Sequence, residues 1–182
     1  AIFGSSTSNA VNLPRCAVRS FPGFFGVLSG VSKRFSASIN VNVIDNTFNR
    51  GAMPAAFLLR KAFDQCKNYK EAVTYLKYEN VMAPVFIQIA DKDESCVIEM
   101  GTSGENTVHH YSEEPLGITN HPLNLEIYSD KMFNLDSYKR LVMVNDLSCD
   151  VKNIYDAQAV MRVRPIMNNN TKNITDNYHN VR

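Results

Sequence analysis

The period of hydrophobic side chains changes repeatedly along this chain, and the order of the changes limits the folds that it can adopt. Between Phe35 and Val43, apolar and polar residues alternate, which is typical of a strand with one apolar face. Residues 54–66 and 69–78 instead repeat apolar side chains at spacings of three and four, as amphipathic helices do. We therefore expect strands and helices in separate groups.

The other segments extend this grouping. Strands are predicted at 15–19, 24–28, 35–43, 85–90, 96–100, 107–113 and 116–119, and helices at 54–66, 69–78, 135–147 and 154–163. The links at 29–34 and 91–95 predict hairpins, and Asn68 with Glu71 predicts a capping box. Strand groups joined by short links favour antiparallel sheets over a doubly wound parallel sheet. The expected fold class is α+β: an αββα sandwich of two antiparallel sheets with helix pairs outside.

One domain is expected, because 182 residues can bury a substantial core. Residues 1–22 are small and polar, which predicts a lead-in loop with one short strand. Residues 23–165 carry the periodic segments and form the predicted αββα domain. Residues 166–182 are rich in asparagine and predict a polar tail.

Composition excludes several classes of function. A net charge of +1 and dispersed basic residues argue against a nucleic-acid partner. No apolar run has the length of about 18–20 residues that a membrane span needs. Adjacent His109 and His110 would point to opposite faces of a strand, so no metal is expected, and no cofactor either. The cysteines form no CxxC pair, which leaves isolated thiols or one disulfide: Cys16, Cys66, Cys96 and Cys149.

The segment PLGITNHPLN at 115–124 places Asn120 and His121 side by side at the end of a predicted strand, just before Pro122. One interpretation is an asparagine that closes a turn. The other is a neutral amide donor held at a rigid strand end, where it can face a developing oxyanion. Near the C-terminus, Asn169 and Asn173 begin two glycosylation acceptor triplets, which favour a lumenal or secreted protein.

Four segments, in order along the chain, resemble segments of one known family. FPGFFGVLSGVSKRFSASIN at 21–40 is similar to GYVGxLTGxxPGxFSLTLN, and residues 57–90 are similar to a helix pair followed by an APxYxI strand. CVIEMG at 96–101 is similar to CVITR, and GITNHPLN…LDSYKR at 117–140 to VQTNxDxW…DDRR. This series resembles the acid ceramidase and N-acylethanolamine-hydrolysing acid amidase family. These are choloylglycine hydrolase-like linear amidases among the N-terminal nucleophile (Ntn) hydrolases, which have an αββα sandwich.

The resemblance implies a linear amide hydrolase. In that family a cysteine becomes the N-terminus of the β-subunit after self-cleavage, its thiol attacks the acyl amide, and its α-amine is the base. By its match to the TN motif, Asn120 is implied to help form the oxyanion hole. The family also has a site arginine in its DDRR segment. That arginine aligns with Tyr138 here, and the role is assigned to Arg140, two residues later. Candidate substrate-binding residues in the first segment are Phe25, Leu28 and Asn40, for which plain structural roles are the alternative.

The sequence also departs from the family. It begins with Ala1 rather than cysteine, Cys16 lies within the chain and has no free α-amine, and Val41 replaces a family glutamate. We expect most of a β-subunit, incomplete at both ends, because a sandwich without its edge strands would expose sheet edges. The nucleophile is then supplied by a segment or subunit of the same protein outside this chain. The alternative is a divergent relative without activity.

The expected function is therefore hydrolysis of a lipid N-acyl amide, ceramide-like or N-acylethanolamine-like, in a lysosomal or secreted glycoprotein matured by autocleavage. Expected partners are the nucleophile-bearing segment and the lipid amide substrate; a lipid substrate also leaves peripheral membrane contact open. Two alternatives stand beside this function: a catalytically inactive sandwich with a binding or structural role, and a related amidase for bile-salt or penicillin-like amides.

Overall fold

The computed structural model describes six parts of the chain, which fall into two compact units, Ala1–Tyr111 and Ser112–Arg182. The described residues are 2–3, 16–43, 45–104, 106–111, 117–123 and 136–166. The predicted 23–165 domain spans parts of both units, and its boundaries stay a prediction.

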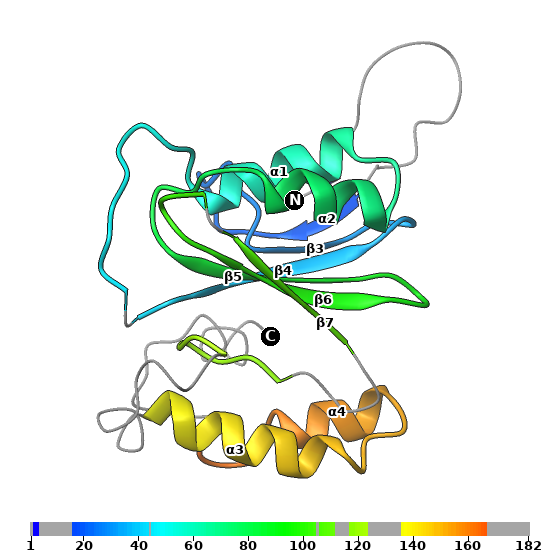
Figure 1. The fold of residues 1–182 in the computed structure, drawn as a ribbon. Coiled ribbons are helices and arrows are strands. Elements are labelled where there is room, and N and C mark those ends of the chain that lie inside the picture. Colours follow the sequence, from blue (N-terminus) through cyan, green and yellow to red (C-terminus); the bar gives the residue numbers. More distant parts are fainter. Residues whose placement is uncertain are drawn as a thin grey trace, which may run out of the picture. The chain divides into compact units, whose positions relative to one another are not determined.

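A meander of seven antiparallel strands and two helices forms the first unit (Figure 1). The strands are β1 (Ile2–Phe3), β2 (Cys16–Arg19), β3 (Ser29–Val31), β4 (Ser36–Val41), β5 (Val85–Ala90), β6 (Ser95–Met100) and β7 (Thr107–His110). Between β4 and β5 come α1 (Ala55–Gln65) and α2 (Tyr69–Lys77). Strand order in the sheet equals order in the chain, so every strand pairs only with its neighbours in the sequence.

The α+β class and the antiparallel pairing are confirmed, but the number of sheets differs from the prediction. The described strands form one sheet, because β4 pairs with β5 over six residues, from Ser36 opposite Ala90 to Val41 opposite Val85. The two predicted strand groups are therefore continuous, and a second sheet is absent from the described residues. Sequence periodicity predicted β4 and β5 as strands but not their pairing, which joins residues that two helices separate in the chain.

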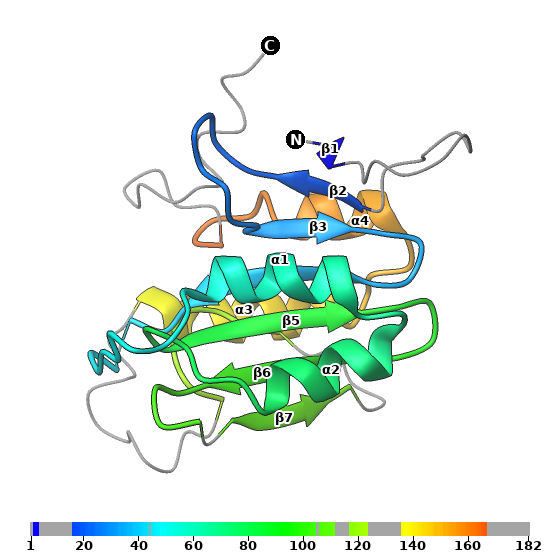
Figure 2. The same cartoon turned by 90° about the horizontal axis from the view of Figure 1, so that it is seen from above.

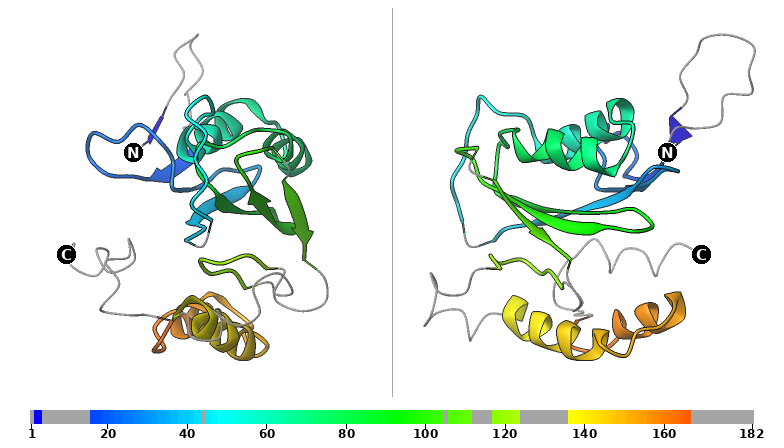
Figure 3. Two further views of the ribbon diagram at one scale, coloured as in Figure 1. Left: turned by 60° about the vertical axis from the view of Figure 1, so that its left-hand side comes forward. Right: turned by 45° about the vertical axis from the view of Figure 1, so that its right-hand side comes forward.

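The core of the first unit lies between the sheet and the two helices. Figure 2 shows α1 crossing over the middle of the sheet and α2 lying towards β7, and both views of Figure 3 place the pair on one face. Phe35, just before β4, stacks on Phe63 of α1 with ring centroids 4.8 Å apart. Around this stack, the following side chains are buried: Leu58, Leu59, Ala62, Ala72, Leu76, Ile87, Ile89 and Ile98.

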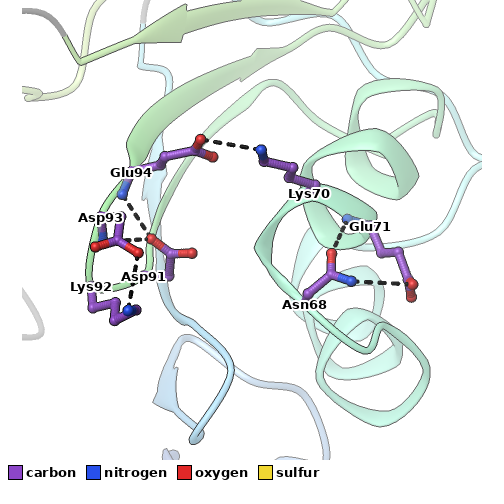
Figure 4. A network of polar contacts seen from close by, with 7 residues as sticks. All are labelled: Asn68, Lys70, Glu71, Asp91, Lys92, Asp93 and Glu94. Atoms are coloured by element: carbon purple, nitrogen blue, oxygen red, sulfur yellow. Dashed lines mark hydrogen bonds and ion pairs between the residues drawn. The ribbon is translucent and has the colours of Figure 1, made fainter.

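Both predicted helical stripes are confirmed, and so is the capping box that begins α2. The side chain of Asn68 accepts a hydrogen bond from the backbone N–H of Glu71 (Figure 4). The carboxylate of Glu71 in turn accepts one from the backbone N–H of Lys67. The first bond satisfies an amide group that the helix leaves without a partner in its first turn, and the second satisfies the amide of the residue before the cap. Figure 4 also shows Lys70 paired with Glu94, 3.3 Å apart, an exposed ion pair that contributes little to stability.

The turn of the β5–β6 hairpin is built around one carboxylate. Oδ1 of Asp91 accepts hydrogen bonds from the backbone N–H groups of Asp93 and Glu94, at 2.8 and 2.7 Å (Figure 4). These bonds lower the pKa of Asp91 below its ordinary value. The predicted hairpin at 91–95 is thereby confirmed, with the local Asx-type bonds that favour aspartate in turns.

The predicted strand at 24–28 is wrong. The chain turns at Pro22 and Gly23, whose φ is +82°, and strand structure begins only at Ser29. The backbone N–H of Val27 bonds to Ala56 O at 2.9 Å, so this segment pairs with the start of α1 rather than with a strand. Gly26 permits that approach, because a Cβ there would lie 2.7 Å from the Cβ of Ala56.

The β3–β4 hairpin is joined to the end of α1 by Arg34. Its guanidinium donates hydrogen bonds to the backbone carbonyls of Phe63 and Cys66. Carbonyls in the last turn of a helix have no partner within the helix, so the cation satisfies them and also faces the negative end of the helix dipole. The hairpin link itself is shorter than the predicted 29–34, because residues 29–31 form β3.

Of the alternating apolar side chains at 35–43, only those at the start of the segment are buried. Phe35 and Ala37 are buried, whereas Val41 and Val43 are 56% exposed each. β4 ends at Val41, so Val43 lies beyond the strand. Strand β7 likewise ends at His110 rather than at residue 113; residues 112–116 lie outside the described part of the chain.

The second unit contains α3 (Asp136–Ser148) and α4 (Ile154–Val160). Both helices are predicted, but α4 has no buried residue, and Ile154 and Met161 of its predicted stripe are more than half exposed. Asn153 caps α4 by accepting bonds from the N–H groups of Tyr155 and Asp156. The predicted strand at 116–119 is wrong over its described residues, 117–119, which belong to no strand.

Candidate functional site

Asn120 and Arg140, which the sequence analysis assigns to one site, lie together in the second unit. Nη2 of Arg140 donates a hydrogen bond of 2.8 Å to Oδ1 of Asn120. The bond binds the acceptor end of the amide, so the NH₂ end of Asn120 points away from the guanidinium. A charged donor also polarises the amide, which strengthens its N–H groups as donors. Their role in catalysis stays a prediction.

His121 forms a second attachment to the same helix. Its Nδ1 lies 2.8 Å from Oγ of Ser137 and 3.1 Å from Oγ1 of Thr119, at hydrogen-bond distance from both hydroxyls. The imidazole is fully buried, and its ring lies 6.0 Å from that of Tyr138 between centroids. Ser137 and Arg140 are three residues apart, so they lie on one face of α3.

Tight packing fixes the segment that carries these side chains. A Cβ on Gly117 would lie 2.3 Å from Oδ1 of Asn145 and 3.2 Å from Cδ1 of Leu141, both on α3. Ile118 and Thr119 are buried. The backbone of Gly117 therefore approaches α3 more closely than a residue with a side chain allows, and the next residues follow along the helix.

Burial and nearby charges shift the pKa values of both ionisable side chains in the site. Burial lowers the pKa of His121 below its ordinary value, and the charge of Arg140 lowers it further. Burial also lowers the pKa of Arg140, while Asp136 acts in the opposite direction. Within the described residues, neither Nε2 of His121 nor Nε of Arg140 has a hydrogen-bond partner. An uncharged imidazole beside a charged guanidinium is the arrangement that these directions favour.

The predicted substrate-binding residues lie in the first unit. Phe25 is 67% exposed, and its backbone carbonyl accepts a hydrogen bond from Arg60. Leu28 is half-buried before β3, and Asn40 lies on β4 opposite Phe86. The structure therefore brings Asn120 and Arg140 together, while these three residues belong to the other unit. Asn169 and Asn173 lie outside the described residues.

The four cysteines are free thiols. Cys16, Cys66 and Cys96 are buried, and burial raises the pKa of each above its ordinary value. Reactive cysteines have the opposite character, with exposure and a pKa lowered by nearby positive charge. Cys149 is exposed, and its thiol lies 3.4 Å from the carbonyl of Asn145. The three buried thiols are thus of the structural kind.

His109 and His110 point to opposite faces of β7, as predicted. His109 lies 3.3 Å from Glu99 on one face, and His110 lines a groove of about 590 Å³ beside α2 on the other. No predicted site residue lines that groove. Among the described residues, no cluster of histidine, cysteine and carboxylate side chains could hold a metal ion.

Comparison with known proteins identifies the family. The sequence model of the family described as "acyl-coenzyme A:6-aminopenicillanic acid acyl-transferase" matches residues 37–178. The chain belongs to this family. The acyl-transferase family is of the Ntn-hydrolase-like amidase type, and the recognition made from the sequence is confirmed. The match includes both Asn120 and Arg140.

Solved structures agree with this family at the level of the fold. Ten chains match, among them a Caenorhabditis elegans N-acylethanolamine-hydrolyzing acid amidase ortholog with a TM-score of 0.70 and 18% sequence identity. The match covers 89% of this chain and 74% of the amidase chain. No curated protein sequence matches. In the described residues, no helix is long and apolar enough to cross a membrane.

Sequence reasoning missed the bonds of His121. The sequence analysis named this residue as the neighbour of Asn120 but gave it no role, and gave Ser137 none at all. A polar residue at the second position of a helix is ordinary, so Ser137 carries no signal by itself. The spacing of 16 residues between His121 and Ser137 is set by the fold, and only coordinates reveal their contact.

Proposed function

We propose that this chain is part of a cysteine-type linear amide hydrolase that cleaves a lipid N-acyl amide, ceramide-like or N-acylethanolamine-like. The observation that carries the proposal is the bond from Arg140 to Oδ1 of Asn120. It holds the amide oxygen on the guanidinium, so that the NH₂ group is the end that would donate to an acyl oxygen. Membership of the acyl-transferase family supports a reaction at an acyl amide.

The chemistry follows from this orientation. A thiolate attacks the amide carbonyl carbon, and negative charge moves onto the carbonyl oxygen. Nδ2 of Asn120 donates to that oxygen, and such a donor is worth ~2.7–4 kcal/mol in a transition state. The C–N bond then breaks as the nitrogen takes up a proton, the amine leaves, and water cleaves the thioester to release the fatty acid and the thiol.

The nucleophile in this proposal is a cysteine of the same protein outside this chain. The raised pKa values of the three buried thiols support that assignment, because a thiol held neutral is a poor nucleophile. The nucleophile-bearing segment and the lipid amide are then the partners of this chain. A lysosomal or secreted location, with glycosylation at Asn169 and Asn173, forms part of the same proposal.

Trapping the acyl-enzyme tests the function. Full-length protein is incubated with a fatty-acyl ethanolamide, quenched with acid and mapped by mass spectrometry. We expect fatty acid release and a thioester on a cysteine other than Cys16, Cys66, Cys96 and Cys149. An acyl group on one of these four would contradict the assignment of the nucleophile, and absence of both thioester and fatty acid would favour the inactive sandwich.

Substitution of Asn120 tests the oxyanion role in the same assay. We expect Asn120→Ala to lower kcat by ~10²–10³-fold, because one oxyanion donor is lost. Gln158→Ala, at an exposed amide on α4, is the matched control and should leave kcat unchanged. A similar thermal unfolding midpoint in both variants separates chemistry from folding. Equal turnover in the wild type and Asn120→Ala would remove the assigned role.

A second candidate function is acyl transfer, which the description of the matched family favours. The same thioester would form, but an amine rather than water would take the acyl group. Adding 6-aminopenicillanic acid to the ethanolamide reaction distinguishes the two. Formation of an acylated penam at the expense of free fatty acid would favour transfer, and fatty acid alone would favour hydrolysis.

A further inference from the structure

Strand β7 forms one margin of the sheet, and in the described residues only β6 pairs with it (Figure 2). Just after β7, the backbone N–H of Tyr111 donates to the carbonyl of Ser95 at 2.9 Å. Bonded and non-bonded pairs alternate in an antiparallel ladder, so every second residue before Tyr111, starting with His109, also bonds to β6. The N–H and C=O groups of Val108 and His110 therefore point outwards from the sheet.

A groove of about 590 Å³ runs along this margin, between α2 and the face of β7 that the helix covers. Val73 of α2 and Val108 of β7 line it. So do Tyr78 and Tyr111, which are 74% and 50% exposed. An open strand edge beside a helical groove is an arrangement that accepts an added strand, because backbone groups pair along the edge while alternate side chains enter the groove.

The two ends of the groove carry opposite charge. Asn106, just before β7, donates a bond of 2.9 Å to the carbonyl of Lys77, so the start of β7 lies beside the end of α2. The other end of the groove is lined by Asp93 and Glu94 of the β5–β6 turn and by Lys70, which pairs with Glu94 at 3.3 Å (Figure 4). A lysine therefore marks the end where β7 begins, and an excess of one carboxylate marks the end where β7 finishes.

We propose that β7 pairs with β7 of a second copy of this chain, antiparallel and about a two-fold axis at His109, so that the two sheets join into one. In this register the outward groups of Val108 face those of His110 in the second copy, and the hydrogen bonds of both pairs form. The contact is self-complementary, as a two-fold interface requires. It involves only the first unit and does not depend on the proposed function.

The charges favour a second copy over an unrelated peptide. The two-fold axis places the start of one β7 beside the end of the other. Lys77 of one copy therefore approaches Glu94 of the other, and the same contact forms again across the axis. Tyr78 and Tyr111 of the two copies are brought together in the same way, and tyrosine is enriched at protein interfaces. The groove thus carries at its two ends the complementary groups that a closed dimer needs.

A proline at position 110 tests the strand pairing. The N–H of His110 points outwards, so His110→Pro removes a donor from the edge and no bond to β6, and edge strands tolerate proline there. Sedimentation velocity of full-length protein at neutral pH covers about 1 to about 100 μM, where short interfaces associate. We expect the wild type to dimerise as concentration rises, and His110→Pro to raise Kd at least ~10-fold, because a hydrogen bond is lost on each side of the axis.

The matched control is His110→Ala, which keeps the backbone N–H and should dimerise more tightly than His110→Pro. A wild type that stays monomeric over the whole range, or equal Kd values for the wild type and His110→Pro, would overturn the proposal.

An exchange of charge tests the register and leaves β7 unchanged, so it holds even if His110→Pro fails to fold. Lys77→Glu and Glu94→Lys each place like charges together at both contacts, and we expect either variant alone to raise Kd ~3–10-fold. Mixed in equal amounts, the two variants should form a heterodimer as tight as the wild-type dimer, because each contact again joins a lysine to a glutamate. Lys61→Glu, at an exposed position of α1, is the control and should leave Kd unchanged. A mixture that binds no more tightly than its components would overturn the proposal.

Hydrogen exchange distinguishes a second copy from another occupant of the edge. We expect the amides of Val108 and His110 to be protected in concentrated protein and to exchange freely after dilution to monomer, as NMR can measure residue by residue. Protection of both amides in the dilute monomer would assign the edge to another segment of the same protein and would overturn the proposal.

Discussion

Asn120 has two chemically different ends, and the guanidinium of Arg140 binds only the oxygen. The bond opposes a half-turn of the amide, which would present a lone pair where a donor is needed. The guanidinium is itself held in a partly buried position, and Asp136 offsets some of the cost of burying its charge. Orientation of one amide is thus the contribution of Arg140 to the candidate site.

Arg140→Gln tests this orientation. We expect kcat to fall by up to ~100-fold with a smaller change in KM, because the amide of Asn120 is no longer held in one orientation. The matched control is Lys139→Gln, which removes the same charge from the neighbouring, exposed position of α3. Equal kcat values for the two variants would show that Arg140 acts only through the net charge of the helix.

For single residues, the sequence indicates which side chains belong to the candidate site better than it indicates which side chains contact one another. The TN motif and the arginine after LDSYK single out Asn120 and Arg140, which the structure then places within hydrogen-bond distance. The bond of His121 to Ser137 was not predictable, since both residue types are common in loops and first helical turns. The Asn153–Asp156 cap of α4 was missed, although its spacing equals that of the predicted Asn68–Glu71 cap.

Among the elements, α1 depends on close approach of the segment before β3. Gly26 lets the chain reach the first turn of the helix, where Val27 bonds to the carbonyl of Ala56. The sequence predicted α1 correctly because its apolar spacing is local. The same sequence predicted a strand at 24–28 because five nearly apolar residues suit a buried strand equally well, and the turn at Pro22 and Gly23 was not weighed.

Gly26→Ala should lower the free energy of unfolding by ~1–3 kcal/mol, the usual cost of overpacking. Its Cβ would lie 2.7 Å from that of Ala56, which the helix backbone holds in place. Gly51→Ala is the control, because its Cβ would meet only Oδ1 of Asn49 at 3.4 Å. Denaturant unfolding of both variants measures the difference, and equal stabilities would show that α1 can shift at no cost.

In the molecule as a whole, the central strands of the seven-stranded sheet pair over more residues than the edge strand β1 does. β5 pairs over six residues with β4 and over six with β6, whereas β1 pairs over two residues with β2. Local periodicity predicted β4 and β5 as strands, but it did not predict that the described strands form one sheet, because the pairing of β4 with β5 spans α1 and α2. The number of sheets is a property of contacts between distant residues, and a single sequence carries little information about them.

Hydrogen exchange should follow this gradient of pairing. We expect the amides of β5 to exchange most slowly and those of β1 most quickly, because β5 opens only when two complete strand pairs are lost. Mass spectrometry of peptides from deuterated full-length protein resolves the two regions. Protection in β1 equal to that in β5 would show that the sheet opens as one unit.

A sheet whose strands follow one another in chain order can be divided without untangling anything. A nick in the connection between β4 and α1 would leave two contiguous fragments, each with its own hairpins intact. For the halves to reassociate, the pairing of β4 with β5 and the contacts of Val27, Arg34 and Phe35 with α1 would have to form again. Both sets of contacts lie in one continuous interface, which makes this connection a natural place to build a split version of the protein.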